Sequence, residues 1–578
     1  MEKTHETAKK TKPVLTGAQV VIESLKKEGV EHIFGYPGAI ILPIYDEIYH
    51  CKEITHYLVR HEQAAVHAAE GYARVTGKPG VALVTSGPGA CNTVTAIANA
   101  YYDAYPLVVI TGQVDSNLIG NDAFQEADVV GITRSCCKHN YLVKDIKKLP
   151  SIIKEAFHIA STGKPGPVVI DIPKDVIDAK VAFEYPEQLH LPGYKPKYSG
   201  HTIQNNKALS LIYNAKRPVI LAGGGIIHSN AHNELFKLAH ELNIPITTTL
   251  MGIGAFPSDD ELSLGMIGMF GTHWSNKAVA ECDVLFAIGT RFSDRVTGEL
   301  SKFCQKAKII HIDIDPCSIS KNVPVNTPIV GDAKIILSDM LEHIDKEQVQ
   351  KNINYKTLWL QQIKEWENTP VPTTCLPDGI CPQTAIQAIH DISKEHDAFI
   401  TTEVGQHQMW TARLQKFNKP RKFLTSGGLG TMGFGFPAAI GAQIAAPDKL
   451  VVGIAGDGSI QMNIQELATC VEYKLPVKIC IINNGCLGMV RQIQEKMFNE
   501  NYSETFLTSP DYVKLAEAYG AIGYKVTEEN ELESTLRTAF DCEGPAVIEI
   551  IVNTYKTIYP WVTPEKLNCK LLQSNYED

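Results

Sequence analysis

The sequence has 578 residues and a net charge of −10, and 44% of its residues are hydrophobic and 20% charged. This length exceeds what one hydrophobic core supports and predicts about three domains, while the acidic balance excludes a broad basic surface for nucleic acid. The polar start MEKTHETAKKTKP lacks the apolar stretch of a secretory signal, and no apolar run approaches the roughly 20 residues that span a bilayer.

The first block of predicted elements covers residues 14–185 and alternates strands with helices. Its strands are short β-branched runs that end in Gly, Ser or Pro, and its helices are amphipathic. This alternation predicts a parallel sheet with helices on both faces. The predicted strands are 80–87, 106–111 and 166–173, and the predicted helices are 17–29 and 63–77.

Two further blocks, 200–345 and 378–556, repeat this alternation. A polar stretch with prolines at 185–200 predicts one linker, and a polar helix followed by the segment 369–382 predicts another. The predicted strands are 217–226, 243–250, 283–292 and 307–315 in the second block and 397–405, 449–458, 477–484 and 545–552 in the third. The predicted fold class is therefore α/β, with three doubly wound parallel-sheet domains in series whose strand orders remain open.

The fourteen cysteines are scattered along the chain without a CxxC pair. A disulfide or zinc framework would need clustered spacing, so the pattern favours reduced and mostly buried thiols. We therefore expect a cytoplasmic protein, and the charge and hydropathy patterns predict neither a nucleic-acid nor a membrane partner.

The segment from residue 456 to 488 carries oxygen ligands at two predicted strand ends. Gly-Asp-Gly ends one strand, Asn-Asn ends the next, and an amphipathic helix at 464–473 lies between them. Ligands of open α/β sheets bind beyond the carboxyl ends of strands, and the oxygens of Asp457 and Asn484 suit Mg²⁺ there. Gly456 and Gly458 would let the backbone approach a diphosphate. The alternative is an ordinary βαβ unit with turn glycines, but two such motifs at this spacing favour a metal-diphosphate site.

This pair of motifs resembles the diphosphate motif of thiamine-diphosphate enzymes, which also need a glutamate from a different domain. The segment VRHEQAAVHAAEGYAR supplies Glu62 just before a predicted helix. In such enzymes this carboxylate hydrogen-bonds the aminopyrimidine ring and so promotes deprotonation of the cofactor. Taken alone, Glu62 would be a carboxylate that caps the first turn of a helix. Because both strand-end motifs are present, we instead interpret Glu62 as the glutamate that activates the cofactor.

Further segments resemble the catalytic subunits of the acetohydroxyacid synthase (acetolactate synthase) family and cover nearly the whole chain. They are SGPGACN, GNDAFQE, KHNYLV, PGPVVIDIPKD, TRFSDRVTG, HIDIDP, EVGQHQMW and GGLGTMGFGFPAAIGA. As a set, they are specific to this family rather than to thiamine-diphosphate enzymes in general. The resemblance implies decarboxylation of pyruvate and transfer of the two-carbon unit to a second 2-keto acid, pyruvate or 2-ketobutyrate, in branched-chain amino-acid biosynthesis.

The resemblance also implies roles for individual residues. The implied catalytic residues are Glu62, Gln125, Lys174, Gly430, whose carbonyl would contact the aminopyrimidine, and Met432, which would bend the cofactor. The implied contacts to thiamine diphosphate are Gln406, His407, Gly456, Gly458 and Met489, and the implied Mg²⁺ ligands are Asp457, Asn484 and the carbonyl of Cys486. The middle block would bind a largely structural FAD through Gly223, Gly224, Arg291, Arg295, Asp313 and Asp332, and Lys164 of the first block stands where the family typically has an arginine near the flavin.

The family also implies an assembly. Its active sites lie between subunits, so we expect a homodimer or a homotetramer. Many members have a separate regulatory subunit that responds to valine, and such a partner is an expectation here as well. The small-molecule partners would be 2-keto acids.

Three segments depart from the family pattern. Ile493 stands where a tryptophan normally favours 2-ketobutyrate over pyruvate, which removes contact area worth about 1–2 kcal/mol of discrimination. Asp115 in GQVDSN adds a negative charge near the expected channel mouth. Ser293 and Phe270 replace an aspartate and a histidine of the flavin region.

These departures leave alternatives open. One is a related FAD- and thiamine-diphosphate-dependent carboligase with a different carbonyl acceptor. Another is a flavin oxidoreductase of the pyruvate oxidase kind, which the segments TRFSDRVTG and KHNYLV disfavour. A third is a scaffold that binds the cofactor without catalysis, which the presence of Glu62 and both metal-ligand motifs disfavours.

Overall fold

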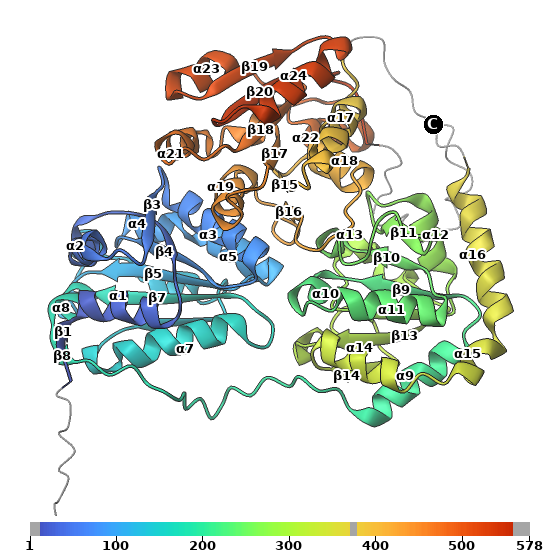
Figure 1. Cartoon of the computed structure of the whole chain (residues 1–578), viewed down its shortest axis with the longest axis horizontal. Coiled ribbons are helices and arrows are strands. Elements are labelled where there is room, and N and C mark those ends of the chain that lie inside the picture. The colour runs from blue at the N-terminus through green and yellow to red at the C-terminus, as the bar shows by residue number, and fades with distance from the viewer. Residues whose placement is uncertain (1–11, 370–378, 559–578) are drawn as a thin grey trace, which may run out of the picture. The chain divides into compact units, whose positions relative to one another are not determined.

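The computed structural model describes residues 12–369 and 379–558. Within these residues, three six-stranded parallel sheets follow one another along the chain (Figure 1). Tertiary contacts group the chain into two compact units, one of Met1–Ala73 and Lys78–Tyr194 and the other of Arg74–Gly77 and Lys195–Asp578. The predicted α/β class with three parallel sheets in series is confirmed.

The N-terminal sheet lies in the first unit and has the strand order β3-β2-β4-β5-β7-β6. Its central strands β4, β5 and β7 are buried along their whole length, so they read as mostly apolar runs in the sequence, with Asp171 the buried charged residue of β7. Helices α1 (Gly17–Lys27), α2 (Leu42–His50) and α7 (Leu149–Ser161) pack on one face. The strands are β2 (His32–Tyr36), β3 (Thr55–Leu58), β4 (Gly80–Val84), β5 (Leu107–Gln113), β6 (His139–Leu142) and β7 (Pro167–Pro173). A short antiparallel pair, β1 (Val14–Thr16) and β8 (Lys180–Ala182), joins the two ends of this block.

The central sheet has the strand order β11-β10-β9-β12-β13-β14. Alternate residues of its strands point to two separate cores, one under α9 (Thr202–Asn214), α11 (His232–Leu242) and α14 (Ala333–Glu342) and the other under α12 (His273–Glu281) and α16 (Ile353–Glu367). This two-sided covering makes the sheet doubly wound. The strands are β9 (Pro218–Ala222), β10 (Ile246–Thr248), β11 (Ser263–Met266), β12 (Val284–Ile288), β13 (Lys308–Asp313) and β14 (Thr327–Val330).

The C-terminal sheet has the strand order β16-β15-β17-β18-β20-β19. Helices α17 (Pro382–Glu395), α18 (Gln406–Leu414) and α24 (Glu529–Asp541) share one core with it. On the opposite face, Thr401 of β15 donates a hydrogen bond to the carbonyl of Gly435, the first residue of α19 (Gly435–Ala445). The strands are β15 (Phe399–Thr402), β16 (Phe423–Thr425), β17 (Val451–Gly456), β18 (Lys478–Asn483), β19 (Ile522–Val526) and β20 (Ala546–Ile551).

Strand order distinguishes the middle sheet from the two outer ones. Numbered from the first strand of each sheet, the N-terminal and C-terminal sheets both run 2-1-3-4-6-5, although their sequences show no residue-level repeat. The central sheet runs 3-2-1-4-5-6, which is the order of dinucleotide-binding sheets. Every strand predicted from an apolar run is present. The edge strands β3, β6, β11, β14, β16 and β19 were not predicted, and neither was β2, which lies inside the N-terminal sheet between β3 and β4.

Other expectations have mixed outcomes. The helix predicted at 464–473 begins as the 3₁₀ turn Ile464–Glu466 and continues as α21 (Leu467–Glu472), and the linker at 185–200 contains no helix or strand. Most of the second predicted linker lies outside the described residues, and the three domain boundaries stay predictions. All cysteines in the described ranges are free, and most of those are buried. Across the same ranges, no helix is both long and apolar enough to cross a membrane.

Candidate active site

The candidate site lies at the carboxyl edge of the C-terminal sheet, between β15 and β17. From β15 the chain continues to β16 on one side, whereas β17 continues to β18 on the other, so the loops after these two strands diverge and leave a crevice. A cavity of about 510 Å³, the open solvent at its mouth included, occupies this place. Its lining includes most predicted residues of this sheet: Gln406, His407, Met432, Gly456, Asp457, Gly458, Asn484, Cys486 and Met489.

Asp457 is held firmly at the base of this cavity. It is the first residue of α20 (Asp457–Ile460), directly after β17, and only 1% of it is exposed. Ser509 Oγ donates to its Oδ2 over 3.1 Å, and the hydroxyl of Tyr512 donates to its backbone carbonyl over 2.6 Å. Burial raises the pKa of Asp457 to about 6, against the opposing hydrogen bond from Ser509. A bound divalent cation would offset the desolvation of this carboxylate.

Two further oxygen donors follow the neighbouring strand β18. The backbone N–H of Cys486 donates to Asn484 Oδ1 over 3.3 Å, and the intervening Gly485 has a φ of +68°, where a glycine carries no steric penalty. A carboxylate, an amide oxygen and a backbone carbonyl form a donor set that Mg²⁺ accepts. Across 12–369 and 379–558, no three His, Cys, Asp or Glu side chains gather as a metal site. The oxygen donors after β17 and β18 therefore fit Mg²⁺, and they do not form a metal site of three or more His, Cys, Asp or Glu side chains.

His407 presents an unsatisfied nitrogen at the same cavity. Its Nε2 is buried and has no hydrogen-bond partner among the described residues. Burial lowers the pKa of its imidazole to about 4. A Cβ at Gly456 would lie 3.1 Å from this ring, and one at Gly458 would lie 2.7 Å from Leu487, so the chain passes closely here only because both residues are glycines. A ligand with hydrogen-bonding oxygens, such as a diphosphate, would satisfy His407.

Glu403 fastens the loop that carries Gly430 and Met432. Its carboxylate accepts hydrogen bonds from the backbone N–H groups of Gly433 (2.6 Å) and Phe436 (3.0 Å), at the start of α19. Burial raises the pKa of Glu403 to about 7. Gly430 and Gly433 have φ values of +74° and +91°, so the loop depends on glycine at both positions. The loop thereby brings Met432 to the cavity lining, whereas Gly430 is not part of it.

We expect Glu403→Gln to remove part of the pH dependence of stability. The folded-state pKa of Glu403 is about 7 and its ordinary value is 4.5. At pH values between these two, the folded protein therefore binds more protons than the unfolded chain does. This contribution, about 3 kcal/mol, is fully present below the ordinary pKa and is lost as the pH rises through about 7. Thermal unfolding of wild type and variant at about pH 5 and about pH 8 measures it.

The matched control is Glu517→Gln, an exposed glutamate of the same sheet region. It should leave the pH dependence unchanged. The expectation for Glu403 is wrong if the difference in thermal stability between wild type and Glu403→Gln is the same at both pH values.

Glu62 lies at the equivalent edge of the N-terminal sheet. It is the first residue of α3 (Glu62–Thr76), the helix that follows β3. Asn92 Nδ2, at the end of α4 (Pro88–Asn92), donates to Glu62 Oε2 over 2.9 Å. A Cβ at Gly89 would lie only 3.3 Å from Glu62 Oε1. The SGPGACN segment therefore orients the Glu62 carboxylate. Glu62 is the first residue of α3, but its hydrogen bond comes from Asn92, outside that helix.

Gln125 and Lys174, the other two residues predicted here, lie in the same unit. Gln125 packs against Gly87: a Cβ on Gly87 would lie 2.7 Å from the Gln125 carbonyl oxygen, and Gly87 has a φ of +57°. Lys174 follows β7 and forms an ion pair with Asp178. The hydrogen bond with Asp178 raises the pKa of Lys174, and the charge of Asp115 acts in the same direction. Their catalytic roles stay predictions.

The predicted flavin contacts of the second unit gather at one edge of the central sheet. Gly223, Arg291 and Asp313 lie at the ends of β9, β12 and β13, around the point where the strand order reverses. A Cβ at Gly223 would lie 2.2 Å from the carbonyl oxygen of Gly289, so this glycine is needed for close packing of two loops. The neighbouring Gly224 begins α10 (Gly224–His228).

Three other predicted flavin contacts have local partners or lie elsewhere. Asp332 caps α14 by accepting a hydrogen bond from the N–H of Ile335 over 3.2 Å. Arg295 is exposed and pairs with Asp294 at 3.0 Å. Lys164 belongs to the first unit, in the turn between α7 and β7. Contact of these side chains with a flavin stays a prediction.

Nearly the whole chain matches known proteins. Residues 15–132, 205–340 and 403–550 match, respectively, the N-terminal TPP binding domain, the central domain and the C-terminal TPP binding domain of thiamine pyrophosphate enzymes. The acetolactate synthase large subunit of Haemophilus influenzae is 49% identical over 551 residues, which are 94% of this chain and 96% of that protein. The chain belongs to the acetolactate synthase family of thiamine pyrophosphate enzymes.

Other members of the acetolactate synthase family match equally completely. The acetolactate synthase isozyme 3 large subunit of Escherichia coli is 46% identical over 558 residues, 95% of this chain and 96% of that protein. The probable acetolactate synthase large subunit of Methanocaldococcus jannaschii is 49% identical over 560 residues, with coverage of 95% and 94%. The family resemblance inferred from the motifs is confirmed.

Several residues that hold the candidate site residues in place were not predicted. Ser509 and Tyr512 hold Asp457, Asn92 orients Glu62, and Glu403 holds the Met432 loop. Asn92 and Glu403 stand inside quoted family segments, SGPGACN and EVGQHQMW, so position within a motif was an available signal. Ser509 and Tyr512 lie far from any motif, and only the fold brings them to Asp457.

Proposed function

We propose that this chain is the catalytic subunit of an acetolactate synthase that binds Mg²⁺ and thiamine diphosphate in the cavity between β15 and β17. The carrying observation is that a desolvated carboxylate, Asp457, and an unpaired imidazole nitrogen, that of His407, line one cavity at a strand-order switch point. The first suits a metal ion and the second a diphosphate. Identity to acetolactate synthase large subunits over almost the whole chain supports the same assignment.

The residues of this chain would divide the work as follows. When bound, thiamine diphosphate supplies a carbon acid that, once deprotonated, adds to pyruvate and accepts the electrons released with CO₂. Asp457, Asn484 and the carbonyl of Cys486 hold the metal ion that neutralises the diphosphate. Glu62 carries the charge that stabilises a proton on the aminopyrimidine ring, and Asn92 keeps its carboxylate oriented. The products of two pyruvates are 2-acetolactate and CO₂.

We propose FAD as a further cofactor, held by the central sheet. The 3-2-1-4-5-6 strand order supports a dinucleotide there, and Arg291 and Asp313 lie at the strand ends that such a ligand occupies. Because the carboligation has no net redox change, the flavin would be structural. An oxidase of the pyruvate oxidase kind would instead use it to reduce oxygen.

We also propose an oligomer, a homodimer or homotetramer, in which a second copy completes each active site. The relatives are named large subunits, which supports a separate smaller partner for this chain as well. A cytoplasmic location, 2-keto acids as substrates and an absence of nucleic-acid and membrane partners complete the proposal.

A product assay tests this function. Purified protein with Mg²⁺, thiamine diphosphate and FAD receives pyruvate, and acetolactate, CO₂ and oxygen uptake are measured together. Acetolactate and CO₂ in equal amounts without oxygen uptake are expected. Release of CO₂ without any acetohydroxyacid would favour the carboligase with another acceptor, and oxygen uptake matching CO₂ release would favour the oxidase.

We expect Ile493→Trp to increase the preference for 2-ketobutyrate over pyruvate by about 5- to 30-fold. Ile493 lies on α22 (Gly488–Met497), whose first residues line the cavity. An indole adds apolar contact area that a longer acceptor uses and pyruvate does not. The measurement is the ratio of the two acetohydroxyacids formed from an equimolar mixture. Ile493→Leu is the control that changes shape without adding a ring, and an unchanged ratio in Ile493→Trp would contradict the expectation.

A further inference from the structure

Helix α22 contacts the cavity and the C-terminal segment Tyr555–Ile558 at once. Gly488 and Met489, in its first turn, line the cavity. Gln492 follows Gly488 by four residues, so both lie on one face of the helix. A Cβ at Gly488 would lie 2.2 Å from Gln406 Oε1, so the missing side chain leaves room for the Gln406 amide against this face.

Gln492 holds the backbone of Ile558 and the side chain of Gln406 together. Its Oε1 accepts hydrogen bonds from Gln406 Nε2 (2.8 Å) and from the N–H of Ile558 (2.9 Å), and its Nε2 donates to the carbonyl of Ile558 (3.2 Å). Gln406 Nε2 also donates to the carbonyl of Lys556 over 3.3 Å. Gln492 is 1% exposed, so water does not replace these bonds in the folded protein.

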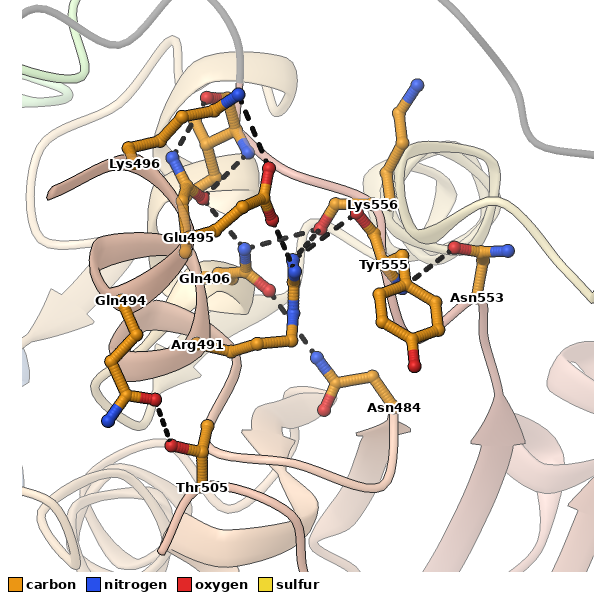
Figure 2. A network of polar contacts seen from close by, with 12 residues as sticks. Gln406, Asn484, Arg491, Gln494, Glu495, Lys496, Thr505, Asn553, Tyr555 and Lys556 are labelled. Atoms are coloured by element: carbon orange, nitrogen blue, oxygen red, sulfur yellow. Dashed lines mark hydrogen bonds and ion pairs between the residues drawn. The ribbon is translucent and has the colours of Figure 1, made fainter. Parts of the chain in front are cut away.

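The same network continues to the predicted metal site. Asn484 Nδ2 donates to Gln406 Oε1 over 3.4 Å (Figure 2). Because Gln492 accepts from the nitrogen of the Gln406 amide, the oxygen of that amide faces Asn484. The orientation of a predicted diphosphate contact is therefore set by a residue that also holds the C-terminal segment.

Arg491 holds the segment from the next position of the helix. Its guanidinium is fully buried and donates through Nη2 to the carbonyls of Tyr555 (3.3 Å) and Lys556 (3.4 Å). Nη1 donates to Glu495 over 2.5 Å, and the group lies 5.6 Å from the centre of the Tyr555 ring. Figure 2 shows Arg491 between Glu495 and Tyr555. Arg491 anchors the segment, whereas the bonds of Gln406 to Gln492 and to the carbonyl of Lys556 join the segment to the cavity.

We propose that Gln492 is a positioning residue that couples docking of the segment Tyr555–Ile558 to cofactor binding in the cavity, an inference that rests on the proposed function. The docked segment fixes Gln492, Gln492 fixes the amide of Gln406, and Gln406 faces Asn484. Thermodynamic linkage requires the effect to be reciprocal: the factor by which the docked segment tightens cofactor binding equals the factor by which the cofactor stabilises docking.

The test compares Gln492→Met with wild type by two measurements that need no turnover. Calorimetric titration of the full-length apoprotein with thiamine diphosphate at saturating Mg²⁺ gives the dissociation constant, expected to rise about tenfold in the variant. Hydrogen exchange of residues 553–558 is expected to slow about tenfold when the cofactor binds wild type and much less in the variant. Gln492→Glu keeps the shape and the Oε1 acceptor, and should lie between the two.

Gln494→Met is the matched control, because Gln494 is a glutamine of the same helix that bonds Ser503 and Thr505 instead. It should change neither measurement by more than about twofold. Thermal unfolding identifies any variant that fails to fold. If Gln492→Met fails to fold, Gln492→Glu is compared with wild type instead. An unchanged dissociation constant in Gln492→Met, or cofactor-independent exchange of 553–558 in wild type, overturns the coupling alone. If wild type binds no thiamine diphosphate, the proposed function fails first and the coupling with it.

Discussion

Replacing Glu62 by glutamine is expected to lower kcat for acetolactate formation by about 10²- to 10⁴-fold. The glutamine keeps the size and one hydrogen-bonding oxygen of the side chain but loses its charge. A neutral amide cannot stabilise a proton on the aminopyrimidine ring, so proton removal from the cofactor slows. The predicted Mg²⁺ ligands follow other strands, and the dissociation constant for thiamine diphosphate should therefore change by less than about threefold.

Two variants make this result specific. Asp46→Asn removes a carboxylate from an exposed position of the same unit and should leave kcat unchanged. Asn92→Ala removes the hydrogen bond to Glu62 Oε2 while leaving the charge, and should lower kcat by about tenfold. A Glu62→Gln enzyme with more than about a tenth of wild-type kcat would show that Glu62 is only a helix-capping carboxylate.

Replacing Asp457 by asparagine is expected to weaken Mg²⁺ binding by at least about 100-fold and to abolish cofactor binding at ordinary Mg²⁺ concentrations. The asparagine keeps the size of the side chain and can still accept from Ser509, so the fold should survive. Asp457 is the only one of the three predicted metal ligands that has an ionisable side chain, so the substitution removes the only negative charge of the set. Metal-dependent binding of thiamine diphosphate, measured by calorimetry over a range of Mg²⁺ concentrations, checks the effect.

The control for Asp457 is Asp448→Asn, an exposed aspartate just before β17. It should bind Mg²⁺ and cofactor as wild type does. Ser509→Ala removes only the hydrogen bond that orients the carboxylate and should weaken Mg²⁺ by about tenfold. Unaltered Mg²⁺ dependence in Asp457→Asn would mean that the metal ion lies elsewhere.

The sequence predicted the parts of the fold that local pattern encodes. Strands such as β4, β17 and β18 are buried on both sides, so their residues are apolar apart from Lys478 and Asn483 at the ends of β18, and each strand is visible as a run. Edge strands such as β19 have exposed residues and less distinct patterns. Strand order was not predictable in this way, because it depends on which strands pair across long stretches of chain.

The same limit applies to the candidate site. Asp457, Asn484 and His407 were predicted because they stand in motifs at strand ends, and the fold brings all three to one cavity. The burial that raises the pKa of Glu403 leaves no local trace in the sequence, since the backbone N–H groups that bind its carboxylate belong to Gly433 and Phe436, in another segment. In the segment GMVRQIQ, the role of Gln492 has no local signal, because its partners lie more than 60 residues away along the chain.

The most direct test of the proposed active site is a crystal structure of the full-length protein with thiamine diphosphate and Mn²⁺ in place of Mg²⁺, with the metal located by its anomalous scattering. We expect one metal ion bound by Asp457, Asn484 and the carbonyl of Cys486 at about 2.1 Å, with the diphosphate beside His407. A metal ion or diphosphate bound away from the ends of β17 and β18 would contradict the assignment of this cavity.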